Sequence, residues 1–264
     1  MANVGGSMHT PTPSTAAPMS TVRTPHRSPR IGLIDAGRGV AILAVIAYHL
    51  VWDLGDFDYL AGHPARSDTG VLIAHCIAGS FLFLVGVSLV LAHGDRFRRQ
   101  AFIRRTLELV AYGVVISLAT YIAMPAQWVS FGILQCIALV SVLALPFLWA
   151  SRMVAVGAAV LAVALPGLVD IPGRSRWVAW TGLTEAGPVT IDHAPVLPLF
   201  ALTLMGIVLM RTLRMRGGDT RLAQVSTDRP PLQWLAFLGR HTLVIYLLHQ
   251  PILLGALYAI RWAT

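Results

Sequence analysis

Residues 31–53 form an apolar run of helix length that carries four ionisable side chains, Asp35, Arg38, His49 and Asp53. At about 100° per residue, Asp35 and Asp53 point the same way on a helix, and the other two fall within roughly 60° of that direction. The four side chains thus share one stripe, which must face something other than lipid. Such a stripe favours a functional role. Charges that reach out from the helix ends, with one hydrogen-bonded histidine between them, would give the same pattern.

The composition places the chain among membrane proteins. Hydrophobic residues make up 56% of its 264 residues and charged residues only 12%, whereas a soluble domain carries about 25% charged residues. We therefore expect an all-α, polytopic transmembrane helix bundle in the lipid bilayer. The net charge is +8. The arginines that supply it stand mainly between apolar runs, so nucleic acid is not an expected partner.

The chain divides into a tail and one membrane domain. Residues 1–30 are rich in Pro, Ser and Thr and have no apolar run, so they are expected to be a disordered cytoplasmic tail. Residues 31–264 are expected to form the transmembrane domain. Its apolar segments predict about seven spans, at about 33–53, 71–92, 107–124, 129–149, 153–169, 193–210 and 235–260.

The arginines predict the orientation of these spans. One set lies in the tail or in alternate connections: Arg23, Arg27, Arg30, Arg96, Arg98, Arg99, Arg104, Arg105, Arg152, Arg211, Arg214, Arg216, Arg221 and Arg229. The smaller set belongs to the opposite side: Arg66, Arg174, Arg176 and Arg261. The positive-inside rule then places the N-terminus in the cytoplasm and the C-terminus outside a plasma membrane.

In this orientation the titratable side chains within the spans gather in the outer half. They are His49, Asp53, His75, Asp192, His193 and His249, and Gln135 lies at a similar depth. Histidine is the side chain best suited to proton transfer near neutral pH. His49 and Asp53 stand four residues apart, so the carboxylate could orient the imidazole along one helix face.

Arginines mark the opposite, inner ends of several spans. Arg38, Arg105 and Arg240 lie at the starts of apolar segments. Guanidinium groups bind phosphate oxygens in pairs, so an inner mouth lined by them suits an anionic ligand with phosphates. An ordinary cytoplasmic collar of positive charge, which only sets topology, would look the same.

The two cysteines indicate neither a disulfide nor a metal centre. Cys76 and Cys136 both lie inside apolar runs, where a cysteine usually serves as a small buried hydrophobic residue. A metal site would need further ligands at suitable spacing. We predict no metal.

Several segments together resemble a family of multipass membrane acyltransferases, heparan-alpha-glucosaminide N-acetyltransferase, catalytic. The segments are DAGRG at 35–39, HCIAGSFLFLVG at 75–86, FGILQCIA at 131–138, DHAPVLP at 192–198 and LGRHTLVIYLLHQP at 238–251. The first and last are fairly specific together, and the likeness covers nearly everything after residue 30.

The resemblance implies acetyl transfer across the membrane, from cytosolic acetyl-CoA to a sugar amine or hydroxyl outside. In the lysosomal member a lumen-side histidine is catalytic, and His49, His63 and His75 fit it here by location. Gln135 stands where many bacterial relatives carry a histidine. It could orient a substrate but could not act as a base. The lysosomal enzyme also has more spans than this chain.

These observations combine into one hypothesis for the site. His49, oriented by Asp53, would deprotonate the acceptor or become acylated itself, and His75 and His249 would complete the outer site. The remaining candidates divide between the two substrates: Arg38, Arg105 and Arg240 for the CoA phosphates, and Gln135, Asp192 and His193 for the acceptor.

Two other functions fit some of the same residues. Intramembrane histidines and aspartates also build proton relays, so a proton-coupled transporter is the first alternative. A membrane redox protein with His49 and His249 as haem ligands is the second. The oligomeric state and the identity of the acceptor stay open at this level.

Overall fold

The computed structural model describes residues 1–2, 31–172, 175–184, 187–188 and 190–263. Within these ranges every regular element is a helix, and the pairing of extended chain is confined to one isolated bridge between Ile171 and Thr184. The predicted all-α class is confirmed. The predicted tail falls, from residue 3 onward, outside the described residues, as does Arg174.

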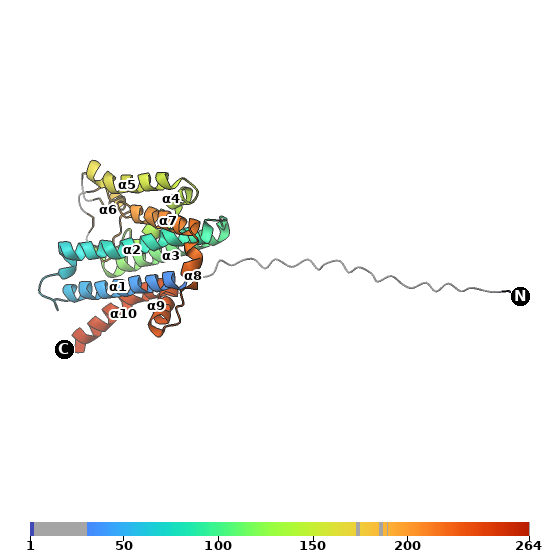
Figure 1. The fold of residues 1–264 in the computed structure, drawn as a ribbon. Coiled ribbons are helices and arrows are strands. Elements are labelled where there is room, and N and C mark those ends of the chain that lie inside the picture. Colours follow the sequence, from blue (N-terminus) through green and yellow to red (C-terminus); the bar gives the residue numbers. More distant parts are fainter. Residues whose placement is uncertain (3–30, 173–174, 185–186, 189, 264) are drawn as a thin grey trace.

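Ten α-helices and three short 3-10 helices follow one another along the described chain (Figure 1). The α-helices are α1 (Gly32–Asp56), α2 (Asp68–His93), α3 (Arg99–Ala123), α4 (Ile133–Ala144), α5 (Arg152–Leu168), α6 (Arg176–Ala179), α7 (Phe200–Met215), α8 (Gly218–Gln224), α9 (Pro230–Arg240) and α10 (Thr242–Ala263). The 3-10 helices are η1 (Pro64–Arg66), η2 (Pro125–Gln127) and η3 (Leu145–Leu148).

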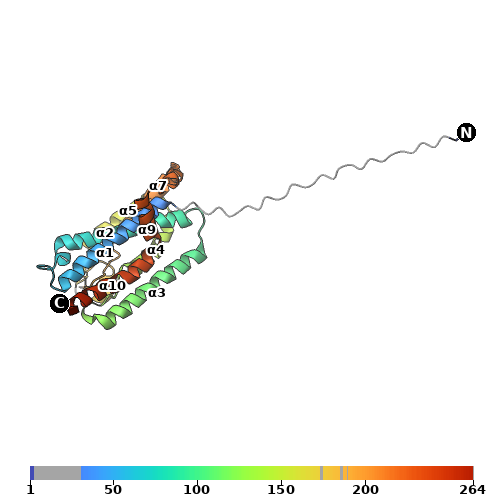
Figure 2. The ribbon, with the colours of Figure 1, turned by 90° about the horizontal axis from the view of Figure 1, so that it is seen from below.

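Four helices, α1, α2, α3 and α10, are long and apolar enough to cross a membrane. Two shorter apolar helices follow α3, over residues 133–148 and 152–168. In Figure 1 the longer helices run roughly along one direction, and the view turned by 90° (Figure 2) places α3 at one edge of the bundle. This arrangement agrees with a membrane bundle.

The sixth predicted segment, 193–210, is helical only in its second part. The chain from residue 190 to 199 is irregular, and α7 begins at Phe200. Pro195 and Pro198 explain the late start, because proline lacks the N–H that a helix interior needs and restricts the residue before it. The irregular stretch therefore brings Asp192 and His193 to the bundle on a loop instead of a helix.

The seventh predicted segment, 235–260, is divided into two helices. The backbone N–H of His241 donates to the carbonyls of both Phe237 and Leu238, which closes α9. α10 then begins at Thr242. α9 packs along α1.

Pairs of glycines set how closely two helix pairs approach. On α1 and α9, a Cβ built on Gly39 would collide with the Leu235 carbonyl, and one on Gly239 with the Asp35 carbonyl. Each glycine thus leaves room for the backbone of the other helix to approach closely, as small residues do in membrane bundles. This contact places Arg38 and Arg240, the neighbours of these glycines, at the same end of the molecule.

A second pair of glycines allows close packing between α2 and α7. A Cβ on Gly86 would meet the Thr203 carbonyl, and one on Gly206 would meet the Phe83 carbonyl. Gly86 and Gly206 thus allow the backbones of α2 and α7 to approach closely. The side chains beside this contact are fully buried, among them Leu82, Leu204 and Ile207.

The two ends of the bundle are distinct, and we name them after residues of α1. At the Arg38 end, Arg214 of α7 reaches Asp95, just after α2, with a 2.6 Å ion pair. At the opposite, Asp56 end, the ring centroids of Phe57 and Tyr258 lie 4.9 Å apart, which joins α10 to the end of α1. The start of α1 and the end of α10 therefore lie at opposite ends.

Candidate functional site

A cavity of about 1480 Å³ extends along the inside of the bundle. Its walls come from α1, α2, α3, α4, α9, α10 and the loop before α7. This volume exceeds the range of roughly 300–1,000 Å³ that is usual for small-molecule sites. Seven of the ten predicted site residues line it: Arg38, His49, His75, Arg105, Asp192, His193 and Arg240.

The Arg38 end of the cavity carries positive charge. Arg38 donates to Asp35 over 2.9 Å and also bonds the hydroxyl of Ser88 on α2, while its side chain stays 32% exposed. Arg105 of α3 is 57% exposed and lies 3.7 Å from Glu108. These contacts hold the guanidinium groups in place without enclosing them, so they could receive an anionic ligand.

His49 and His249 meet where α1 and α10 pack together. Both side chains are buried, and their ring centroids lie 4.9 Å apart. Nδ1 of His249 lies 2.6 Å from the carbonyl oxygen of Tyr246. A carbonyl can only accept, so this nitrogen carries the hydrogen and Nε2 of His249 holds a lone pair. His49 lines the cavity and His249 lies behind it.

Asp53 is 1% exposed and also lies outside the cavity lining. Its Oδ1 atom accepts a 2.7 Å hydrogen bond from Nε2 of Gln250 on α10. The sequence predicted a direct pair between His49 and Asp53. Among the described residues the hydrogen bond to this carboxylate comes from Gln250 instead. Gln250 was not a candidate, although it directly follows His249 in the chain.

Asp192 joins three elements at the cavity wall. Its carboxylate accepts from the N–H of Ile133, at the start of α4, at 3.2 Å to each oxygen and from the hydroxyl of Tyr246 at 2.6 Å. Burial raises the pKa of Asp192, and the bonds from Tyr246 and Ile133 oppose that change. Asp192 thus fixes the loop before α7 to α4 and α10.

The side-chain amide of Gln135 makes its hydrogen bonds to other residues of the bundle. Its Oε1 atom accepts from the N–H of Gly132 at 3.1 Å, and its Nε2 donates to the Gly113 carbonyl and the Ser117 hydroxyl, both at 3.0 Å. Gln135 therefore starts α4 and fastens it to α3. It is not among the residues that line the cavity, and its predicted contact with the acceptor stays a prediction.

His75 and His193 face the cavity from different elements. His75, on α2, bonds the Val71 carbonyl of its own helix through Nδ1 at 2.9 Å. His193 comes from the loop before α7, next to Asp192. The cavity at this depth therefore has imidazoles on two walls, and His49 on α1 provides a third.

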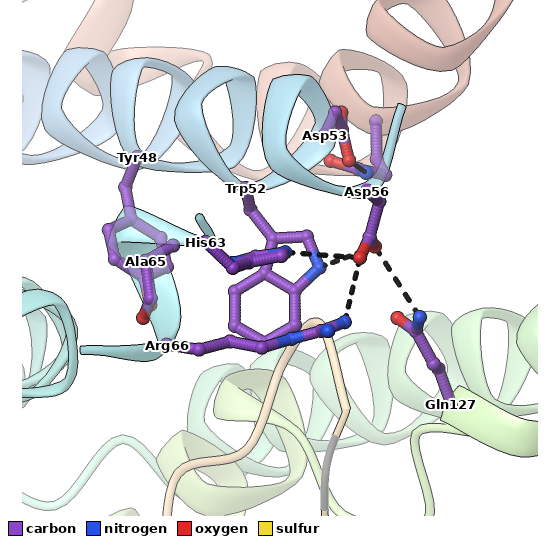
Figure 3. Close-up of polar contacts among 9 residues, drawn as sticks. Tyr48, Trp52, Asp53, Asp56, His63, Ala65, Arg66 and Gln127 are labelled. Carbon is purple, nitrogen blue, oxygen red and sulfur yellow. Dashed lines mark hydrogen bonds and ion pairs between the residues drawn. The ribbon is translucent and has the colours of Figure 1, made fainter. Parts of the chain in front are cut away.

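A hydrogen-bonded cluster around Asp56 closes the other end of α1 (Figure 3). The carboxylate accepts from Trp52 at 3.0 Å, from Arg66 at 2.7 Å and from Gln127 at 3.4 Å, and Nε2 of His63 lies 3.0 Å away. We call these five residues the Asp56 cluster. It ties η1 and η2 to the end of α1. His63 belongs to this cluster and does not line the cavity.

Two aromatic contacts shape the cluster further. The Arg66 guanidinium lies 5.1 Å from the centre of the Trp52 ring, and the His63 ring is 5.0 Å from it. Arg66 and Trp52 both line the cavity.

Asp56 was not a candidate from the sequence, because its four partners come from three separate segments. No group of three or more potential metal ligands occurs in the part of the chain that the structure describes.

Fold and site together define a helical membrane protein with a large internal cavity, which is basic at one end and rich in histidine farther along. The chain belongs to the family described as heparan-alpha-glucosaminide N-acetyltransferase, catalytic, whose model matches residues 30–251. The resemblance seen in the sequence is thereby confirmed. This is an acetyltransferase family that uses acetyl-CoA as donor. No curated protein and no solved structure matches the chain.

Proposed function

We propose that this protein transfers an acetyl group from cytosolic acetyl-CoA to an amine or hydroxyl of a sugar on the far side of the plasma membrane. The observation that carries the proposal is the cavity, because its lining includes Arg38 and Arg240 at one end and His49 and His75 farther along. A route of this kind could hold the donor and the acceptor at once. The family supports the reaction class.

The basic end would bind the donor. Arg38, Arg105 and Arg240 lie on three different helices and line the same end of the cavity. Guanidinium groups in such an arrangement suit phosphates, as in the nucleotide part of CoA. The acetyl thioester would then extend along the cavity toward His49.

His49 would act as the general base. As the acceptor nitrogen or oxygen attacks the acetyl carbonyl, Nε2 of His49 takes its proton, the carbon–sulfur bond breaks and the CoA thiolate leaves. The thiolate then regains a proton to give the free thiol. Asp53 and His249 would support the charged imidazole from behind, and His75, Gln135, Asp192 and His193 would position the acceptor.

The arginine distribution supports the proposed orientation. The connections near the Arg38 end hold most of the described arginines, whereas Arg66, Arg176 and Arg261 belong to the Asp56 end. We therefore place the Arg38 end in the cytoplasm. α4 with η3, α5 and α7 would complete the four long helices to seven crossings, which puts the C-terminus outside.

Acetyl transfer tests the function directly. The purified protein in detergent, given radiolabelled acetyl-CoA and a panel of amino sugars, is expected to release CoA and label an acceptor. Labelling in the wild type together with its loss in His49→Ala would support the proposal. Absence of both acetyl-CoA binding and turnover in a folded wild type would refute it.

Thiol labelling tests the orientation independently. In a Cys76→Ser background, where the remaining Cys136 is fully buried, single cysteines would replace the exposed Ala61 and Ser226. A membrane-impermeant maleimide should label Ala61→Cys in intact cells and Ser226→Cys only after permeabilisation. The reverse pattern would invert the proposed topology.

A further inference from the structure

Four polar atoms at the contact of α1 with α10 are buried and have no hydrogen-bond partner among the described residues. They are His49 Nδ1, Asp53 Oδ2, His249 Nε2 and Gln250 Oε1. Of these four residues only His49 lines the cavity. A buried polar atom without a hydrogen-bond partner destabilises a fold, so four of them at one place indicate a functional role.

Three of the four atoms are acceptors when Asp53 is ionised. Nε2 of His249 holds a lone pair, because Nδ1 of that ring donates to Tyr246. The amide nitrogen of Gln250 faces Asp53, which leaves its oxygen as the free atom. The second oxygen of Asp53 accepts as well when it is ionised. His49 Nδ1 is therefore the one atom of the four that can carry a hydrogen while Asp53 is ionised.

The three acceptor atoms around His49 favour one of its two neutral tautomers. Acceptors on its buried side favour a hydrogen on Nδ1, and a neutral imidazole with a hydrogen there has its lone pair on Nε2. His49 Nε2 is not among the buried unpartnered atoms, and the residue lines the cavity. The lone pair is thus available on the cavity side, where a base must meet the acceptor.

Gln250 holds the carboxylate of Asp53 in place. Its 2.7 Å hydrogen bond to Asp53 Oδ1 crosses from α10 to α1 and occupies one of the two carboxylate oxygens. The other oxygen has no partner among the described residues, and it stands one helical turn from His49 on the same helix, where its negative charge favours a hydrogen on Nδ1 without a direct hydrogen bond. Without the amide, neither carboxylate oxygen would have a donor on α10.

We propose that Gln250 is a positioning residue that acts through Asp53 to hold His49 in the Nδ1–H tautomer, with Nε2 free toward the cavity. The inference rests on the proposed function, because the tautomer matters only if His49 is the base. It adds to that function a residue that touches neither substrate. The tautomer can be measured without any turnover, which keeps the two claims separable.

The test is nitrogen NMR of the full-length protein labelled with ¹⁵N-histidine, in detergent near neutral pH. The ¹⁵N shifts of a neutral imidazole distinguish its two tautomers, and the His49 signals are those lost in His49→Gln. Wild type should show the Nδ1–H form. Gln250→Leu should show a mixture of tautomers, and so should Gln250→Glu, which keeps the size of the side chain.

Gln233→Leu is the matched control, because Gln233 is an exposed glutamine on α9 whose amide donates to the Asp228 carbonyl. It should leave the His49 signals unchanged. An Nε2–H form in the wild type, or a His49 spectrum unchanged in a folded Gln250→Leu or Gln250→Glu, would overturn the inference. The expected tautomers in a protein without acetyl transfer would refute the proposed function and leave the assignment of Gln250 to His49 standing.

Discussion

The imidazole rings of His49 and His249 lie 4.9 Å apart, inclined by 60° and buried between α1 and α10. This spacing leaves no room for a porphyrin plane between the rings, which argues against the haem alternative with these two ligands. It does allow one ring to influence the protonation of the other. His49 lines the cavity, whereas His249 does not. Only His49 can therefore contact a substrate held there.

Substitution of His49 should reduce acetyl transfer more than substitution of His249. His49→Ala is expected to lower kcat for acetyl transfer by about 10²–10⁴-fold, the usual contribution of a general base. Acetyl-CoA affinity should change little, because the arginines lie at the other end of the cavity. Both quantities can be measured with radiolabelled acetyl-CoA in detergent.

His241→Ala serves as the control, since His241 is exposed at the end of α9 and outside the cavity lining. It should keep wild-type turnover. Full activity in a folded His49→Ala would remove His49 from the mechanism, and His63 and His75 would be the next positions to test.

Arg38→Met should weaken acetyl-CoA binding. A hydrogen bond to a charged group contributes about 1.5–3 kcal/mol, which corresponds to roughly a tenfold to hundredfold rise in Kd. The change should appear in Kd and leave kcat at saturating donor largely intact. Isothermal titration of the purified variant measures it.

Arg229→Met provides the comparison, because Arg229 is an exposed arginine just before α9 and does not line the cavity. Its Kd should match that of the wild type. An equal effect of both substitutions would mean that the positive charge of the chain as a whole attracts the donor, without a site at Arg38.

Gly206→Val should destabilise the bundle. The added side chain would begin with a Cβ that already collides with the Phe83 carbonyl, so α2 and α7 must separate. A loss of a few kcal/mol is expected, on the order of other overpacked sites. Thermal unfolding in detergent, followed by size-exclusion chromatography, reports it.

Gly157→Val tests whether the effect comes from the helix contact. A Cβ at Gly157 of α5 meets nothing within 4 Å. This variant should unfold near the wild-type temperature. Comparable losses at both glycines would contradict the assignment of Gly206 to close helix packing.

Asp56→Ala should loosen the connection between α1 and α2. The substitution removes the acceptor shared by Trp52, His63, Arg66 and Gln127. Residues 57–67 should then become more susceptible to limited proteolysis, which mass spectrometry of the fragments would locate. Asp170→Ala, at an exposed aspartate after α5, should leave the digestion pattern unchanged.

Helices were the part of the structure that the sequence predicted well, because long apolar runs leave few other choices for a backbone in lipid. Interruptions were harder to place. Pro195 and Pro198 delay α7, and α9, which packs on α1, ends at Arg240 just before His241. Neither position can be fixed from the apolar pattern alone.

Residue type and helical spacing indicated which side chains could line a common cavity, but not which side chains would bond to one another. Arg38 and His49 line one cavity, as expected for residues on one helical stripe. Asp53, in contrast, bonds to Gln250, which is 197 residues away in the chain. Contacts of that kind depend on how α1 meets α10, and helical spacing within one segment carries no information about them.

Acetyl-CoA binding by the purified, folded protein in detergent is the decisive measurement, because the proposed function requires a donor site at the Arg38 end. Isothermal titration with acetyl-CoA and with CoA, on wild type and Arg38→Met, uses the protein without any knowledge of the acceptor. We expect saturable binding of both ligands by the wild type, weakened about tenfold or more in the variant. No saturable binding to a wild type shown to be folded would contradict it.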